Sequence, residues 1–235
     1  MKSFYTILYI VAACVSICAS AAEKTVVESC FNLKVLDGWF DVGMKSPPAE
    51  THARIAEDDG RAVLMTSDNR WAGLSCKFTE PVTVDGNLKA ITLLIRHKQA
   101  GKGFNIGSVA LSSRECLDIH NGKAFANGKD SGFTVIGHLY GPNCHITTRL
   151  DGRDDKTIRQ SNPTRQPFLR AHKTWSDWRV TYDNEKKEIS VTVDGALEPA
   201  LVLHAVDFNG KTFRSVWIGQ MESAYESIKV ITSYK

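Results

Sequence analysis

Two runs of alternating residues, joined by a polar turn, constrain the fold of this chain more than any other feature. Residues 175–195 read W-S-D-W-R-V-T-Y-D-N-E-K-K-E-I-S-V-T-V-D-G. Alternate positions are apolar at 178–182 in the first run and at 189–193 in the second. Such period-two alternation on both sides of a polar turn at 183–187 is typical of a half-buried antiparallel hairpin. The sequence therefore predicts a β-hairpin that buries one face.

Short strand-like segments separated by turn signals continue along most of the chain. Turn signals such as Asn121-Gly122 and Asn209-Gly210 stand between them, and the polar stretch 151–173 is predicted as a loop or a pair of loops. We find no amphipathic helix longer than two turns. We therefore expect an all-β chain, folded as an antiparallel β-sandwich of two curved sheets. Besides the hairpin, the predicted strands are 62–66, 72–78, 88–96, 104–111, 115–120, 133–140, 145–150, 215–219 and 227–234.

The N-terminus has the order of a secretory signal peptide. Lys2 precedes an apolar run from 4 to 17, and the small residues Ala19-Ser20-Ala21 follow. The run is too short, and too close to this cleavage pattern, for a stable membrane span. We expect cleavage after residue 21, which leaves 22–235 as one domain that is secreted, periplasmic or at the cell surface. An alternative interpretation takes Cys14, which follows small residues, as a lipid-attachment site.

The net charge and the number of cysteines restrict the partners and the compartment that we expect for this chain. The formal net charge is +3, and no basic cluster interleaves with aromatic residues, so we expect no nucleic-acid partner. No stretch after the signal peptide is apolar and long enough to span a bilayer. Cys30, Cys76, Cys116 and Cys144 remain after cleavage, an even number that suits two disulfides in an oxidising compartment. Three connectivities are open.

The hairpin resembles a pattern of a known superfamily. Residues 175–195 are similar to the W-x-x-V-x-Y-D…I-x-V-Y-V-D-G hairpin of laminin-G-like and other concanavalin A-like domains. The segments 216–220 and 228–230 resemble the closing strands of those domains, although Thr192 replaces a common aromatic residue and 227–229 replaces an acidic turn. The resemblance implies a jelly roll with a concave face that often binds glycans. Some relatives are polysaccharide hydrolases or lyases, and many only bind.

The known catalytic patterns of the superfamily are largely missing. The glycosidase motif E-x-D-x-x-E does not occur in the sequence. Alginate-lyase-like motifs are matched only in part, by 113–117 and 118–120. The resemblance therefore implies no particular mechanism.

A second predicted hairpin, at 133–150, carries the best local cluster of polar residues. His138 and Tyr140 share a face in its first strand because side chains alternate. If a tight Gly-Pro-Asn-Cys turn follows, Tyr140 pairs with His145, and Arg149 lies on the same face. In that register His138 would pair with Thr147.

The chemistry of this cluster is suited to β-elimination. A histidine or tyrosine would abstract a proton, and Arg149 would neutralise a uronate carboxylate. Two further interpretations stay open, a ligand-binding face without catalysis and an ordinary solvent-facing hairpin. A one-residue slip in register would scatter the cluster.

Two tryptophans are candidates for stacking on a sugar ring. Trp71 lies beside polar loop residues, and Trp175 opens a strand after a long loop. The alternative for both is a place in the core. Trp178 and Trp217 sit within alternating strands and are expected in the core.

One acidic turn is the only candidate cation site. Asp151, Asp154 and Asp155 gather three carboxylates, and calcium prefers oxygen ligands. Arg153 between them favours a solvated charged turn instead. We therefore expect no cofactor, with structural calcium as the alternative.

We expect this chain to be an exported, lectin-like domain that binds a carbohydrate or glycan without turning it over. The first alternative is a polysaccharide lyase or glycoside hydrolase of the same jelly-roll fold, with His138, Tyr140, His145 and Arg149 as its site. The second alternative is a cell-surface module that binds a protein.

Overall fold

The computed structural model describes residues 22–30, 39–41, 53–67, 73–101, 105–114, 130–138, 144–160, 171, 173–219 and 222–235. The predicted signal peptide and Cys14 lie outside these residues. The described ranges contain fifteen strands and no helix. They are β1 (Glu23–Cys30), β2 (Trp39–Asp41), β3 (Ala53–Asp58), β4 (Arg61–Thr66), β5 (Gly73–Thr83), β6 (Leu88–Gln99), β7 (Asn105–Ser112), β8 (Gly132–His138), β9 (Cys144–Leu150), β10 (Arg153–Gln160), β11 (Ser176–Asp183), β12 (Glu188–Val193), β13 (Leu201–Leu203), β14 (Thr212–Gly219) and β15 (Ser223–Tyr234).

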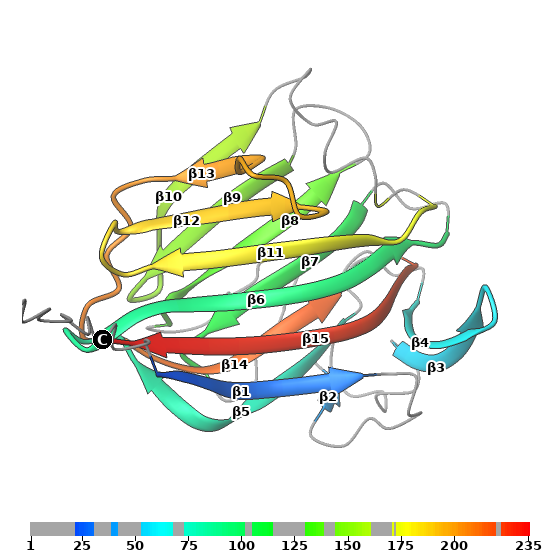
Figure 1. Cartoon of the computed structure of the whole chain (residues 1–235), viewed down its shortest axis with the longest axis horizontal. Helices are drawn as coiled ribbons and strands as arrows, with labels where there is room; N and C mark the ends of the chain where they lie inside the picture. Colours follow the sequence, from blue (N-terminus) through cyan, green and yellow to red (C-terminus); the bar gives the residue numbers. More distant parts are fainter. Residues whose placement is uncertain are drawn as a thin grey trace, which may run out of the picture.

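The strands form two antiparallel sheets that lie one behind the other (Figure 1). Sheet A has the order β13-β12-β11-β6-β15-β4-β3, and β1 also pairs with β15. Sheet B has the order β10-β9-β8-β7-β14-β5-β2. Sheet A lies in front in Figure 1, and sheet B lies behind it. The prediction of an all-β antiparallel sandwich is confirmed.

The hairpin at 175–195 is confirmed as β11 and β12. Trp178 pairs with Val193, and Tyr182 pairs with Ile189. Burial alternates along β11. Trp178, Val180 and Tyr182, which were predicted to share the buried face, point between the sheets. Burying a large apolar side chain stabilises a fold by about 1.5–3 kcal/mol. The hairpin therefore contributes to the core that both sheets share.

A buried histidine joins the sheets near one end of β6. His97 is 1% exposed, and its ring lies 4.3 Å, centroid to centroid, from the Trp178 ring and 5.6 Å from the Tyr225 ring. Gly107 of sheet B lies against it, since a Cβ there would be 2.6 Å from two atoms of the imidazole. The φ of Gly107 is 138°, a backbone conformation that favours glycine. This position therefore requires a residue without a side chain.

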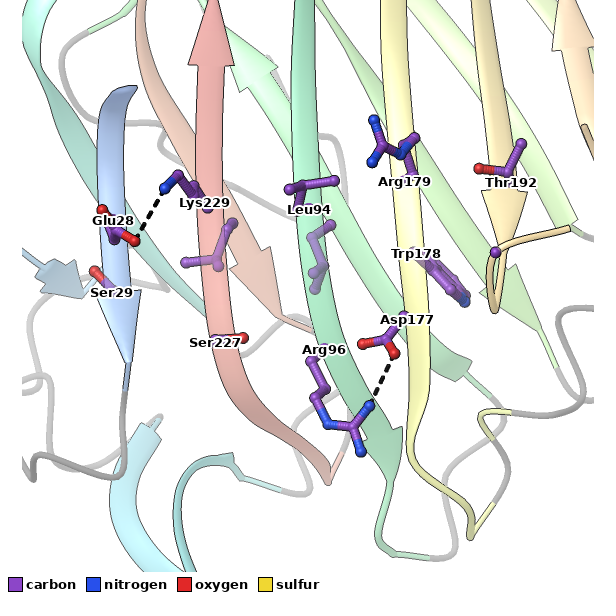
Figure 2. Close-up of a pocket in the computed structure, with 13 residues that line it drawn as sticks. Glu28, Ser29, Leu94, Arg96, Asp177, Trp178, Arg179, Thr192, Ser227 and Lys229 are labelled. Atoms are coloured by element: carbon purple, nitrogen blue, oxygen red, sulfur yellow. Dashed lines mark hydrogen bonds and ion pairs between the residues drawn. The ribbon is translucent and has the colours of Figure 1, made fainter. Parts of the chain in front are cut away.

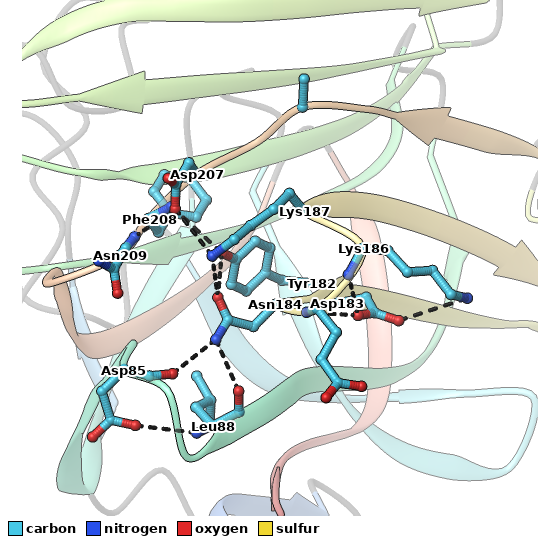
Figure 3. A network of polar contacts seen from close by, with 12 residues as sticks. Asp85, Leu88, Tyr182, Asp183, Asn184, Lys186, Lys187, Asp207, Phe208 and Asn209 are labelled. Carbon is cyan, nitrogen blue, oxygen red and sulfur yellow. Dashed lines mark hydrogen bonds and ion pairs between the residues drawn. The ribbon is translucent and has the colours of Figure 1, made fainter.

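A side-chain amide ties together the turns at one end of the sandwich (Figure 3). Asn184 Nδ2 donates to the carbonyl oxygens of Asp85, at 2.9 Å, and Leu88, at 2.8 Å. Asn184 Oδ1 accepts from the Tyr182 hydroxyl, at 3.0 Å, and from Lys187 Nζ, at 2.9 Å. Burial raises the pKa of Tyr182 to about 12, so its hydroxyl stays a donor over the neutral range.

Part of the predicted loop at 151–173 is a strand. β10 occupies 153–160, and Asp151 and Gly152 form a two-residue turn between β9 and β10, with φ values of 49° and 83°. Such turns with two positive φ values match the twist of a hairpin. The strands β1, β2, β3 and β13 were not predicted either, and the predicted strand at 115–120 lies outside the described residues.

Candidate functional site

The outer face of sheet B carries an open polar strip over β8, β9 and β10. In β9, Cys144 and Ile146 belong to the core, and the alternate residues His145, Thr147 and Arg149 point outward. Ile136 pairs with His145, and Thr134 pairs with Thr147, so these four residues share the face. Thr147 Oγ1 lies 3.2 Å from Thr157 Oγ1 across the β9–β10 pair. Thr134 is buried at the border of this strip. We call the remaining set the β8–β10 strip: Ile136, His145, Thr147, Arg149 and Thr157.

The predicted register of this hairpin was wrong, but its face was right. His145 pairs with Ile136 and not with Tyr140, a shift of four positions, because the connection between the strands is longer than a tight turn. An even shift leaves each side chain on the same face, so His145 and Arg149 stay together on the outer side. The backbone of His138 pairs with Asn105 of β7 instead of Thr147. The side chain of His138, and all of Tyr140, lie outside the described part of the chain.

Arg149 is partly engaged by the neighbouring turn. Its Nη2 donates to the carbonyl oxygen of Gly152 at 2.5 Å. Its Nε is buried and has no hydrogen-bond partner.

Beside the strip, the outer face of sheet B becomes buried and rich in hydroxyl groups. Trp217 of β14 lies between Ala110 of β7 and Ser75 of β5 and is 0% exposed. Its neighbours Val216 and Ile218 belong to the core cluster between the sheets, so Trp217 points to the other side. The prediction that Trp217 is buried in the protein is confirmed, and its side chain lies on the outer side of sheet B and not between the two sheets. The buried hydroxyl residues of this face are Ser75, Ser108, Ser112, Thr134 and Ser215.

Three polar groups on this hydroxyl-rich face have no hydrogen-bond partner. They are Ser108 Oγ, Ser215 Oγ and Trp217 Nε1, all buried. In contrast, the Ser75 hydroxyl donates to the Val216 carbonyl at 3.2 Å. Nearly all buried polar groups in proteins are hydrogen-bonded, so three unpaired groups on one face are unusual.

The position of the Trp217 ring depends on a glycine. A Cβ on Gly73 would lie 2.5 Å from two atoms of the Trp217 ring and 2.5 Å from the carbonyl oxygen of Ile218. The indole therefore lies directly against the β5 backbone. No sequence pattern indicated this contact, because it joins strands that are distant in the sequence.

Trp175 lies among cations of its own chain. Arg61 Cζ, Arg96 Cζ and Lys98 Nζ lie 5.8, 5.9 and 5.3 Å from the centroid of its ring. Such cation–π contacts stabilise by about 0.5–1 kcal/mol each at exposed sites. A sugar that stacks on Trp175 would compete with these contacts. Trp71, the other predicted platform, lies outside the described residues.

Acidic residues hold these cations in place. Arg96 Nη1 lies 2.9 Å from Asp177, and Arg96 Nε lies 2.7 Å from Glu226. Lys98 Nζ contacts Asp58 at 2.6 Å and Asp59 at 2.5 Å. Although burial lowers the pKa of Lys98, the hydrogen bonds and charges of both aspartates raise it above its ordinary value. Lys98 therefore remains charged at neutral pH.

The outer face of sheet A also has a groove of about 560 Å³ (Figure 2). Leu94 of β6 lies in its floor, flanked by Arg179 of β11 and Lys229 of β15. Figure 2 shows the Arg96–Asp177 ion pair to one side of Leu94, Arg179 and Lys229. We call it the sheet A groove.

The acidic turn has a partner within the protein. Lys211 Nζ lies 2.6 and 2.8 Å from the two carboxylate oxygens of Asp151. Asp155 is exposed, and the side chain of Asp154 lies outside the described part. Among the described residues, no group of three or more histidines, cysteines, aspartates or glutamates could hold a metal ion. Structural calcium at this turn stays the untested alternative to the expectation of no cofactor.

The cysteines that the structure describes form no disulfide with one another. Cys76 is buried, its Sγ lies 3.5 Å from the carbonyl oxygen of Lys77, and burial raises the pKa of its thiol to about 11. The side chains of Cys30 and Cys116 lie outside the described residues. Disulfides that involve these two cysteines stay a prediction. Within the described ranges, no helix has the length and apolarity to cross a bilayer.

Comparison with solved structures identifies the architecture. A metal-free lectin I-B4 from Griffonia simplicifolia aligns over 87% of this chain and 98% of its own, with a TM-score of 0.51 and 12% identity. A protein of unknown function with a galectin-like fold from Bacillus subtilis aligns over 92% of this chain and all of its own, also with a TM-score of 0.51 and 12% identity.

The fold is a concanavalin A-like jelly roll. A Bauhinia forficata lectin, solved in complex with GalNAc, shares the jelly roll at 10% identity and a TM-score of 0.51, over 92% of this chain and 99% of its own. Identities this low establish the jelly roll alone. The sequence matches no protein-family model and no curated protein.

Proposed function

We propose that this protein is an exported carbohydrate-binding domain that binds its glycan on the outer face of sheet B without cleaving it. The observation that supports this most directly is the set of accessible polar side chains His145, Thr147 and Arg149 on one face of β9, with Thr157 of β10 beside Thr147. Sugars present many hydroxyl groups that both donate and accept hydrogen bonds. Threonine hydroxyls beside an imidazole and a guanidinium are complementary to them.

The polar groups of the strip itself suit a neutral sugar. The Thr147 and Thr157 hydroxyls form a pair 3.2 Å apart, and His145 is half-buried beside them. Hydroxyl and imidazole groups orient a sugar by hydrogen bonds that need no formal charge. Apolar contact would come from Ile136, which pairs with His145.

A glycan array followed by titration of variants tests the proposal. Thr147→Val removes one hydroxyl and keeps the side-chain shape, and we expect about tenfold weaker binding of a neutral oligosaccharide because a hydrogen bond is lost. Thr181→Val is the matched control, since the Thr181 and Thr92 hydroxyls form an equivalent pair, 3.3 Å apart, on sheet A. Equal loss in both variants, or no neutral glycan bound by the wild type, would contradict the proposal.

Two other outcomes distinguish the alternative functions. Release of unsaturated or reducing ends from a polysaccharide, lost in His145→Ala while the fold is kept, would favour the lyase or hydrolase. Binding of a protein partner with no response to any glycan would favour the interaction module. Export predicts that the protein recovered from the secretory route begins at Ala22, which N-terminal sequencing detects.

A further inference from the structure

One cross-strand row forms the middle of the sheet A groove. Registers place Arg179 beside Leu94 and Leu94 beside Lys229. Thr192 and Glu28 extend the row at its two ends. Adjacent strands are about 4.8 Å apart, so the backbones of Arg179 and Lys229 are separated by about 10 Å.

Among the described residues, some charged side chains of this groove form ion pairs within the protein, and Arg179 does not. Glu28 lies 3.1 Å from Lys229, and Asp177 lies 2.9 Å from Arg96. Arg179 is exposed and makes no ion pair or hydrogen bond within the described part of the chain. The groove therefore has one free guanidinium next to an aliphatic floor.

The second cation can also turn toward a ligand. The side chains of Lys229 and Glu28 are 36% and 64% exposed, so water screens their ion pair and it stabilises the fold little. A ligand anion can exchange for Glu28 at small cost. The groove can thus present two cations, one on each side of Leu94.

The strands under the middle of the groove offer no edge to a peptide that binds by strand addition, although β1 at one end of the groove pairs only with β15. β15, β6 and β11 are interior strands that are paired on both sides, so they offer no free backbone edge. Ser29, Thr192 and Ser227 also line the groove and supply hydroxyl groups. An apolar floor between hydroxyl groups and cations is complementary to a sugar ring that carries an acid.

We propose that the sheet A groove is a second ligand site, which binds a uronate-bearing oligosaccharide with its carboxylate on Arg179 and the C–H face of its ring on Leu94. A guanidinium binds a carboxylate through two parallel hydrogen bonds. The groove volume of about 560 Å³ is within the range of small-molecule sites. This site lies on the opposite sheet from the β8–β10 strip and does not depend on it.

Titration calorimetry of the full chain with an oligogalacturonate tests this site. We expect saturable binding that weakens with added salt and falls at least tenfold in Arg179→Gln. Leu94→Ser should also weaken it. Arg153→Gln, at an exposed arginine of sheet B, is the matched control and should bind as the wild type does. A denaturation midpoint for each variant verifies that it folds.

The outcomes separate the two proposals. Unchanged uronate binding in Arg179→Gln, equal loss in Arg153→Gln, or no binding of the oligouronate would overturn the second site. Binding of a sulfated oligosaccharide but not of the uronate would overturn its assignment to a carboxylate. Thr147→Val should leave uronate binding unchanged, so the glycan site on sheet B can fail while the second site stands, and the reverse.

Discussion

The Asn184 amide should be a major determinant of stability, and Asn184→Ala tests this. Asn184 is 8% exposed, and its side chain makes four hydrogen bonds of 2.8–3.0 Å, two of them to backbone carbonyls of another turn. Each such bond contributes about 0.5–1.5 kcal/mol net. The bond to Lys187 is nearer to solvent, so we take its contribution as about 0.5 kcal/mol, the lower value of this range. We therefore expect Asn184→Ala to lower the free energy of unfolding by about 3 kcal/mol.

Urea denaturation, followed by tryptophan fluorescence, measures this effect as a lower midpoint at an unchanged m-value. Asn87→Ala is the control, because Asn87 is exposed in the adjoining turn and uses its backbone N–H, not its side chain, to bond Asp85 Oδ1. It should change stability by less than about 0.5 kcal/mol. A cost below about 1 kcal/mol for Asn184→Ala, or equal costs for both variants, would refute the assigned network.

Three further predictions follow from buried groups. Gly107→Ala should destabilise the fold by about 1–3 kcal/mol, measured in urea, because its Cβ would overlap the His97 ring; a neutral effect would contradict that contact. Tyr182 has its pKa raised from 10.0 to about 12, so its contribution to stability is complete below pH 10 and is lost as the pH rises to 12. That loss is about 3 kcal/mol, and Tyr182→Phe should reduce it in denaturation curves between pH 9 and 12. Cys76, whose thiol pKa is raised to about 11, should react with a thiol reagent only after unfolding, and fast labelling of the native protein would show that it is accessible.

The hairpin at 175–195 was predictable because only one of its faces is buried. Trp178 and Tyr182 point into the core, and Arg179 points to solvent, so the alternation in sequence follows the alternation in burial. The register of β8 and β9 was not predictable in the same way. An even shift keeps the same side chains inside, so alternation is satisfied by pairing His145 with Ile136 or with Tyr140. The length of the connection between β8 and β9 decides between these two registers, and the alternation of apolar residues does not indicate that length.

Two other features could not be predicted from the sequence, for physical reasons. β14 is buried on both faces, so Val216, Trp217 and Ile218 form a continuous apolar run that does not reveal on which side Trp217 lies. The strand β10 reads R-D-D-K-T-I-R-Q and lies at the edge of sheet B. Edge strands commonly carry charged residues, which protect the free edge from pairing with other chains and remove the apolar alternation.

The candidate site could be predicted only in part. The sequence indicated His145 and Arg149 as outward-facing neighbours on one strand, and the structure places them so. The unpaired Ser108 and Ser215 hydroxyls were not identified. They belong to strands far apart in the sequence, and lone serines in a strand give no signal before the sheet order is known.

Mapping of amide chemical shifts on addition of a neutral oligosaccharide tests the central claim most directly. We predict that the saturable shifts cluster on β8, β9 and β10, and that Thr147→Val weakens them. Shifts confined to the outer face of sheet A, or no saturable shift with any neutral glycan that the array identifies, would contradict a carbohydrate site on sheet B.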